Sequence, residues 1–298
     1  MANIKIVSQL EIASKPHVSE SRRILKVMFG RWIVTAGVVI TILLILVALL
    51  APVISPYDPD EQNLSQLLVS PSSQHLLGTD NLGRDIMSRL IWGSRISLMV
   101  GIVAVSIAAV LGMTFGIIAG YYGGWIGAVI MRLMDTLLSI PPLLLMLAIA
   151  AALGSGLFNV LIAIGVGMFP TYCRLMNSQI ITLRHSEFVV AAETIGAKDL
   201  RIMLRHLLPN SFPPLLVLIT LNMGTAIMME ASLSFLGIGI APPTATWGAM
   251  ISNGYLYILT NPLMSFVPGI CILSVVLSFN MIGDGLRDAL DPKLRGVI

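Results

Sequence analysis

Two acidic residues stand inside long apolar runs of this sequence, where a carboxylate needs a specific reason to be present. Glu230 lies deep within the run at residues 212–240. An ionised carboxylate at such a position costs roughly 2.5–3.5 kcal/mol on membrane-insertion scales, so the residue is expected to face a cavity or a polar partner. Two interpretations stay open. Glu230 lines a translocation path and meets a cationic group of the solute, or it is hydrogen-bonded and locks helices together.

The second acidic residue, Asp135, follows Arg132 by three positions, which predicts a local ion pair on one side of a helix. A loop before the second apolar run holds four aspartates, Asp58, Asp60, Asp80 and Asp85. Their spacing is not that of an EF-hand, so a calcium site is not predicted. We expect Asp80 to serve in a turn or as a helix cap before Arg84.

Motifs of catalytic sites are absent from the sequence. It contains no phosphate-binding Gly-x-x-x-x-Gly-Lys-Ser/Thr loop, no His-Glu-x-x-His zinc pair and no Gly-x-Ser-x-Gly nucleophile turn. Cys173 and Cys271 fall within or beside apolar runs and predict neither a disulfide framework nor a metal site. We therefore expect a chain that is not an enzyme and holds no cofactor of its own.

The elements that position these residues are membrane helices. Hydrophobic residues make up 56% of the 298 residues, charged residues 11%, and the mean hydropathy is +0.90. Six apolar runs reach the length of about 20 residues that a spanning helix needs, and they lack the alternation of a barrel. The sequence predicts an all-α membrane protein with spans at residues 33–54, 96–121, 129–153, 157–181, 212–240 and 263–282.

These runs divide the chain into five parts. We expect an N-terminal arm at 1–32, a first span at 33–54, an outer loop with an amphipathic helix at 55–95, a membrane core at 96–283 and a tail at 284–298. Fifteen of the 18 Lys and Arg residues lie in the arm, in the tail, in a short turn with Arg132, or in a polar loop at 182–211 counted together with Arg174 before it. Because short cytoplasmic loops are rich in these residues, both termini and the polar loop are predicted to be cytoplasmic. The net charge of +3 is accounted for by these loops and does not indicate nucleic-acid binding.

The polar loop has the pattern of two short helices around a glycine. Phe188, Ala191, Ala192 and Ile195 recur at helical spacing, and Gly196 is expected to end that helix. Asp199 is expected to cap a second helix that ends at Pro209. In that helix one predicted apolar face holds Leu200, Met203, Leu204 and Leu207, and another face holds Arg201 and Arg205. The result is a helical elbow suited to entering a groove on another protein.

Small residues are dense in the predicted spans. Gly112, Gly116 and Gly120 are spaced four apart, so they lie on one face of a helix and permit close approach of a neighbour. We expect this face to pack within the chain. The pairs Pro141-Pro142 and Pro213-Pro214 are expected to kink or start helices.

The polar loop resembles the signature cytoplasmic loop of permease subunits in binding-protein-dependent ABC importers. That signature reads Glu-Ala-Ala, three residues, Gly, nine residues, then Ile-x-Leu-Pro. Ala191, Ala192, Gly196, Leu208 and Pro209 fall on it in register. Two positions differ, because Val190 stands in place of the Glu and His206 in place of the Ile. Glu187 and Glu193 are the nearest acidic residues, and His206 before Leu-Leu-Pro-Asn is typical of the peptide-import branch.

Four more segments are similar to the C-type permease of dipeptide, oligopeptide and nickel importers, and they occur in the family's order. They are LGTDNLGRD from residue 77, LSFLGIG from 233, PPTATWGAMI from 242 and NMIGDGLRDALDPKLRG from 280. The resemblance covers all but the first 30 or so residues. It implies the fold of a type I ABC importer permease.

The resemblance also implies partners and a site. The family's permease works with a second homologous permease, two cytoplasmic ATPases that bind ATP and Mg, and an external solute-binding protein, in a bacterial or archaeal inner membrane. The loop at 182–211 would then be a coupling helix seated on an ATPase. Its expected coupling residues are Glu187, Ala191, Ala192, Gly196, Ala197, Arg201, Arg205, His206 and Pro209.

The substrate implied by the resemblance is a di- or oligopeptide, and nickel or a metal chelate is the alternative within the family. An ion-coupled secondary transporter is an alternative of a different class. Such a transporter needs its own ion-coupling residues in the membrane. Glu230 and Asp135 are few for that purpose, so this alternative is less favoured.

Overall fold

The computed structural model describes residues 28–290, so predictions for most of the N-terminal arm and for the last eight residues lie outside the described part. Its helices are α3 (Trp32–Ile54), α4 (Ile86–Tyr122), α5 (Gly124–Leu138), α6 (Pro142–Leu153), α7 (Leu157–Leu183), α8 (Glu187–Thr194), α9 (Asp199–Ile202), the π-helical turn η1 (Met203–Leu207), α10 (Leu208–Phe235), α11 (Trp247–Tyr255) and α12 (Leu263–Leu290). Five helical segments within this part are long and apolar enough to cross a membrane, or six if the bent pair α5 and α6 counts as one span. The prediction of an all-α membrane protein is confirmed.

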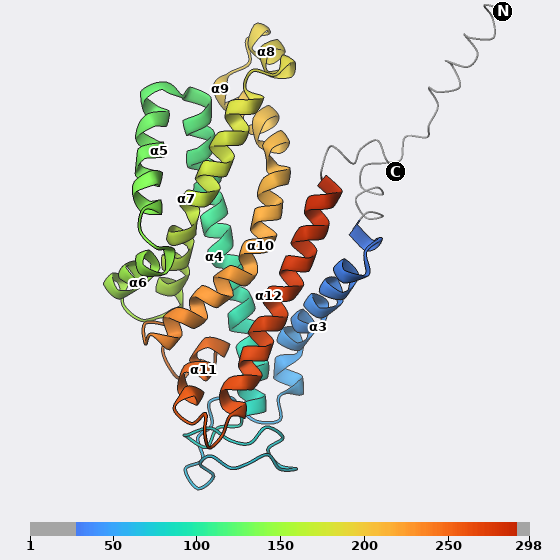
Figure 1. Cartoon of the computed structure of the whole chain (residues 1–298), viewed down its shortest axis with the longest axis vertical. Helices are drawn as coiled ribbons and strands as arrows, with labels where there is room; N and C mark the ends of the chain where they lie inside the picture. Colours follow the sequence, from blue (N-terminus) through green and yellow to red (C-terminus); the bar gives the residue numbers. More distant parts are fainter. Residues whose placement is uncertain (1–27, 291–298) are drawn as a thin grey trace, which may run out of the picture.

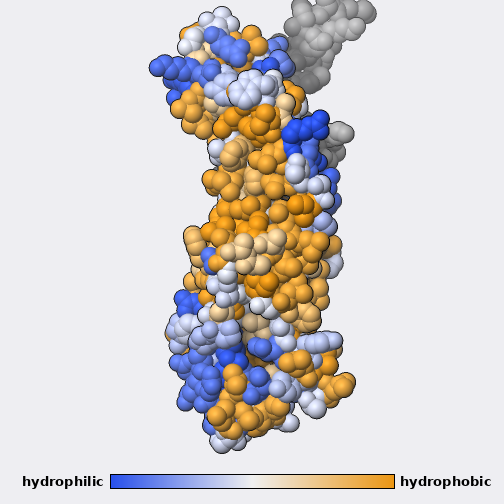
Figure 2. All heavy atoms as spheres, turned by 90° about the vertical axis from the view of Figure 1, so that its left-hand side faces the viewer, coloured by the Kyte–Doolittle hydropathy of each residue, from blue (hydrophilic) through white to orange (hydrophobic). Residues whose placement is uncertain are grey.

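The long helices run between two polar ends. The start of α3, the end of α12 and the loop with α8 and α9 lie toward one end, whereas the outer loop and α11 lie at the other (Figure 1). Figure 2 shows a broad hydrophobic band between polar surfaces at the two ends. This arrangement is what a lipid bilayer requires of a helical protein.

The third predicted span is broken in the middle. Residues 129–153 were expected to form one helix, but α5 and α6 meet at an angle of 93°. The break follows from Pro141 and Pro142, since the ring of a proline excludes a continuous helix and Pro142 instead starts α6.

Helix α4, which contains the second predicted span, begins earlier than the sequence indicated. The amphipathic segment before residue 96 was expected as a separate helix along the membrane surface, but it forms the first turns of α4, which begins at Ile86. Arg89 on this segment is buried and lies 3.7 Å from Asp80, which also binds Arg84 at 2.7 Å. Because the polar side of the segment is paired within the chain, it is not a free surface face.

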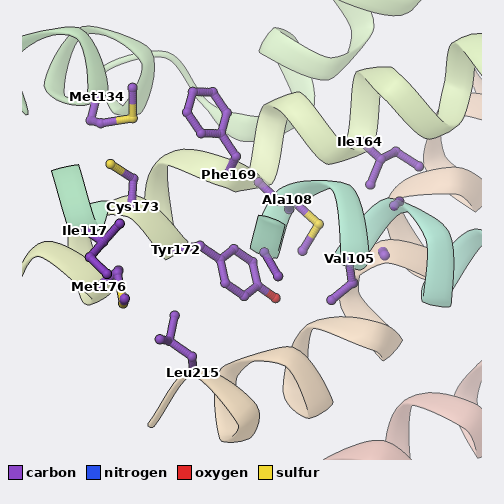
Figure 3. Packing of buried hydrophobic residues seen from close by; sticks show 14 of the residues in the cluster. Val105, Ala108, Ile117, Met134, Ile164, Phe169, Tyr172, Cys173, Met176 and Leu215 are labelled. Atoms are coloured by element: carbon purple, nitrogen blue, oxygen red, sulfur yellow. The ribbon is translucent and has the colours of Figure 1, made fainter. Parts of the chain in front are cut away.

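Among residues 28–290, helices α4 and α7 share the most extensive contact between two helices. A Cβ atom on Gly112 would lie 2.3 Å from Cβ of Tyr172, and one on Gly116 would lie 2.6 Å from the carbonyl oxygen of Cys173. The same is true of Gly120 against Ile180, at 2.7 Å. Figure 3 shows the side chains of α7 gathered around this contact. The expected packing of the glycine face within the chain is confirmed.

Gly116→Ala should therefore destabilise the protein, because its methyl group would overlap a backbone carbonyl. We expect a loss of about 1–3 kcal/mol in the free energy of unfolding, measured by thermal or denaturant unfolding of the detergent-solubilised protein. Gly269→Ala in α12 is the matched control, since nothing lies within 4 Å of its added Cβ. Equal stability of the two variants would contradict the assigned role of the glycine face.

Candidate functional site

The polar loop turns at Gly196, as predicted. This glycine has φ of +77°, a backbone conformation that side chains disfavour. The amide of Ala197 donates to the carbonyl oxygen of Ala192 at 3.0 Å, and the amide of Gly196 donates to that of Glu193 at 2.9 Å. These two bonds satisfy the last carbonyls of α8 and fix the elbow between α8 and α9.

The second half of the loop differs from the prediction. Pro209 was expected to end the second helix, but α9, η1 and α10 form one continuous helical segment, Asp199–Phe235. The π-helical turn directly before Pro209 explains this, because its wider backbone spacing accommodates a ring that would clash within a regular α-helix.

Asp199 also has a different role from the predicted one. Lys198 occupies the capping position of α9, and no side chain caps that helix. The Asp199 carboxylate instead accepts a hydrogen bond of 3.0 Å from the hydroxyl group of Tyr121 at the end of α4. The guanidinium of Arg184 donates to the carbonyl oxygen of Gly120 at 3.3 Å. Neither contact could be read from the sequence, because the partners are 78 and 64 residues apart.

The helix faces of the loop also differ from the predicted ones. Of the face expected around Phe188, Ala191, Ala192 and Ile195, only Ala192 is buried. The side chains of the loop that belong to the buried hydrophobic core are Val189, Ala192, Ile202, Met203 and Leu207. Those that point outward are Phe188, Val190, Ile195, Leu200 and Leu204, and Ile195 is 84% exposed. We call these five residues the apolar docking patch.

Charged and small residues surround the patch. Glu187, Ala191, Gly196, Arg201, Arg205 and Pro209 are exposed, whereas Ala197 and His206 are half-buried. Within residues 28–290, neither Arg201 nor Arg205 takes part in an ion pair. The structure therefore brings the predicted coupling residues together on one exposed elbow, in which apolar side chains and two arginines face outward. Apolar side chains together with arginine are typical of surfaces by which proteins contact one another.

Glu230 lies at the other end of α10 and is fully buried. One carboxylate oxygen accepts hydrogen bonds from the hydroxyl groups of Ser234 at 2.8 Å and Thr246 at 3.0 Å. Thr246 also caps α11 by accepting from the amide of Ala249 at 3.1 Å. Glu230 thus joins α10 to α11, which supports the helix-packing interpretation that the sequence left open.

The residues next to Thr246 complete this junction, and the sequence predicted no role for them beyond their place in the segment PPTATWGAMI. The indole NH of Trp247 donates to the carbonyl oxygen of Leu90 on α4 at 3.0 Å. Gly248 lets α11 approach α10, because a Cβ there would lie 2.5 Å from Cα of Ala231. The segment PPTATWGAMI therefore holds three helices together at the outer end.

The outer loop contains a buried polar cluster in place of a cation site. Asp80 forms the predicted turn, with its carboxylate accepting from the amide of Arg84 at 3.0 Å. The cap of α4 is Asp85, which accepts from the amide of Ser88 at 2.7 Å. His75 lies 2.9 Å from the same carboxylate group. Each acidic group is thus engaged by neighbouring donors of the loop.

The predicted ion pair of Asp135 with Arg132 is wrong. Asp135 pairs with Arg174, which the sequence placed beside the polar loop but which lies within α7. Arg132 is an exposed residue in the middle of α5, and not part of a turn. The sequence could not reveal this pair, because the two residues are 39 positions apart.

Comparison with known families gives two matches. Residues 112–296 match the model of the inner membrane component of binding-protein-dependent transport systems. Residues 19–71 match the model of the N-terminal transmembrane domain of oligopeptide transport permease C. Together these matches leave out residues 72–111 of the described part, which hold the end of the loop before α4 and most of α4 itself.

Several curated proteins are similar over most of their length. The dipeptide transport system permease protein DppC of Alkalihalophilus pseudofirmus is 45% identical over 93% of this chain and 91% of its own. The probable D,D-dipeptide transport system permease protein DdpC of Escherichia coli K12 is 42% identical over 90% of each chain. The di/tripeptide transport system permease protein DppC of Pseudomonas aeruginosa is 44% identical, over 87% of this chain and 88% of its own.

Among solved structures, the fold is similar to that of a chain of the MetNI methionine ABC transporter in inward-facing conformations. The TM-score is 0.56 at 19% sequence identity, and the match covers 69% of this chain and 98% of that chain. This likeness concerns the fold alone. It confirms the predicted fold of an ABC importer permease.

The junction at Glu230 generates a stability prediction. Glu230→Gln keeps an oxygen that can accept from Ser234 and Thr246, so it should be tolerated. Glu230→Ala leaves two buried hydroxyl groups without their partner and should cost about 1–3 kcal/mol in the free energy of unfolding. Thermal unfolding of both variants in detergent measures the difference. A Gln variant as unstable as the Ala variant would contradict the packing role.

Proposed function

The chain belongs to the family of inner membrane components of binding-protein-dependent transport systems, and on that premise we propose that it carries short peptides into the cell. It is a non-catalytic, multi-pass permease subunit of an ABC importer in the bacterial inner membrane, and ATP is bound by partner ATPases. The substrate class is supported by the curated relatives, whose names specify dipeptides, D,D-dipeptides or di- and tripeptides.

We further propose that the elbow around Gly196 receives the work of ATP hydrolysis. The apolar docking patch and the exposed Arg201 and Arg205 would seat in a groove of an ATPase. The family implies an ATPase and a binding protein as partners. A second permease and a second ATPase complete the assembly in this proposal.

Three connections would carry a displacement of the elbow into the membrane. The elbow is joined to α7 by only three residues, and α9 continues into α10 without a break. The hydrogen bond from Tyr121 to Asp199 adds a direct link to α4. Helices joined in this way move as discrete bodies, which suits an exchange between inward-facing and outward-facing arrangements.

The proposed orientation puts both termini and the elbow in the cytoplasm. The bias of Lys and Arg supports it, as does the position of the start of α3 and the end of α12 toward the same end as α8 (Figure 1). In the permease expressed without its ATPases, a cysteine introduced at Ile195 should react with a membrane-impermeant thiol reagent in inside-out vesicles and not in right-side-out vesicles. The opposite result would refute the orientation.

Peptide import is tested by reconstituting the complete transporter with its binding protein in liposomes. We expect uptake of a radiolabelled dipeptide that needs ATP on the cytoplasmic side and persists when ionophores collapse the ion gradients. Uptake that stops with the gradients would indicate a secondary transporter. Uptake of nickel without uptake of peptide would indicate a metal importer.

Ile195→Asp should abolish coupling, because it places a charge in the centre of the apolar docking patch. We expect at least a tenfold loss of ATP-driven uptake, with the permease still inserted and folded. Leu259→Asp is the matched control, since Leu259 is 96% exposed at the opposite end of the molecule. Unchanged uptake by Ile195→Asp, in a complex that still contains the ATPases, would refute the docking role.

Gly196→Arg is a second test of the elbow. The space around Gly196 is open, with nothing within 4 Å of an added Cβ, but its positive φ disfavours any side chain. The variant should abolish transport with membrane insertion intact, whereas Gly196→Asn should retain part of it because Asn tolerates this conformation. Normal uptake by Gly196→Arg would show that the elbow does not transmit work.

A further inference from the structure

An ion pair lies between two candidate spanning segments on the exposed side of this chain. Arg174 and Asp135 join α7 to α5, and their side chains are 54% and 47% exposed. At 1.5 Å per residue, Asp135 lies about 16 Å along α5 from Gly124, and Arg174 lies about 13 Å along α7 from Leu183. Both residues are therefore about two to three helical turns inside those helix ends, within segments that are long and apolar enough to cross a membrane.

Half-exposed charges within such segments cannot face lipid. Ionisable residues within spans face a water-filled cavity or a polar partner, because charges in hydrocarbon are costly. The surface of α7 around Arg174 is polar as well. Thr171, Ser178 and Thr182 are exposed and lie three, four and eight positions from Arg174, hence on the same face of the helix. This face meets water or polar groups in the assembled transporter.

A cavity adjoins the polar face of α7. Leu175 directly follows Arg174 in the sequence, and Gln179 directly follows Ser178. These two residues line a space of about 570 Å³. Its other walls come from α10, including Asn210, and from α12, including Arg287. The volume falls within the range of small-molecule sites. Neither Asp135 nor Arg174 lines this cavity, so the surface to which the ion pair belongs is the polar face of α7 itself, from Thr171 to Thr182.

We propose that this surface is a substrate-binding site of the permease and that the Asp135–Arg174 pair binds the charged ends of a short peptide. This inference rests on the proposed function. A free dipeptide carries one carboxylate and one ammonium group, which match Arg174 and Asp135 in charge. The guanidinium suits a carboxylate because it can form two parallel hydrogen bonds. The two protein charges neutralise each other when the site is empty. The free-energy cost of unpaired charges is therefore small between transport cycles.

Thiol labelling tests whether this face is lined by water and occupied by peptide. Ser178→Cys is made with Cys173 and Cys271 replaced by alanine, and the assembled transporter is labelled in inside-out vesicles with a charged methanethiosulfonate reagent. Leu49→Cys, an exposed position of the apolar helix α3, is the control. We expect Ser178→Cys to react at least tenfold faster than the control and to be protected by a dipeptide. Absence of reaction both with and without ATP, or reaction without protection, would overturn the proposal.

Charge variants test the recognition of the peptide ends. Arg174→Gln should lower uptake of a free dipeptide by about tenfold or more, the usual effect of losing a charge-assisted hydrogen bond. Arg174→Lys should restore part of this uptake. The C-terminally amidated dipeptide lacks the carboxylate, so the Arg174→Gln transporter should take it up about as well as wild type does. Arg31→Gln is the matched control, because Arg31 pairs with Asp288 between α3 and α12 outside this face.

The outcomes separate this inference from the proposed function. Parallel losses for the free and the amidated peptide would assign the pair a structural role and overturn the inference while peptide import stands. A wild-type transporter that takes up no dipeptide would refute the proposed function itself.

Discussion

The close contact of α4 with α7 is the constraint on which the functional parts depend. Three glycines remove the side chains that would hold the two helices apart, so backbone meets side chain along several turns. The same two helices end beside the elbow, where Arg184 at the end of α7 donates to Gly120 of α4 and Tyr121 of α4 donates to Asp199 of α9. Because the elbow buries few side chains of its own, its position is set by these helix ends. Packing inside the membrane thus determines how the docking patch is presented outside it.

Four acidic residues of this protein are of two kinds, three that are enclosed by the chain and one that remains half exposed. At the end opposite the elbow, the carboxylates of Asp80 and Asp85 accept hydrogen bonds from Arg84 and Ser88. Glu230 accepts two hydrogen bonds through one oxygen, while its other oxygen is buried without a partner among the described residues. These three carboxylates are structural because their hydrogen bonds lie within one chain. The pair of Asp135 and Arg174 is different, since both side chains remain half exposed within candidate spanning segments. A single chain leaves this pair incomplete, whereas Glu230 is enclosed, and this contrast favours the pair over Glu230 as a contact for substrate.

The sequence predicted features that depend on local geometry. Gly196 ends α8 because a positive φ is a property of one residue, and the glycines of α4 were recognised because their spacing defines a face. Features that depend on tertiary contacts were missed. Asp135 pairs with Arg174, 39 residues away, and not with Arg132, three residues away. The π-helical turn shifted the register of the second loop helix, so that Leu200 and Leu204 face outward while Met203 and Leu207 face inward.

The π-helical turn also has a mechanical consequence. Without it, Pro209 would end the helix and separate the elbow from α10 by a second flexible joint. With it, the segment Asp199–Phe235 is one helical body with the elbow at one end and Glu230 near the other. Glu230 holds Thr246 at the start of α11, so the body connects the elbow to the outer end of the molecule. The left-handed joint at Gly196 allows α8 to change direction, while any axial displacement of α9 passes directly to α10. A hinge on one side and an unbroken helix on the other give the elbow a defined direction of transmission.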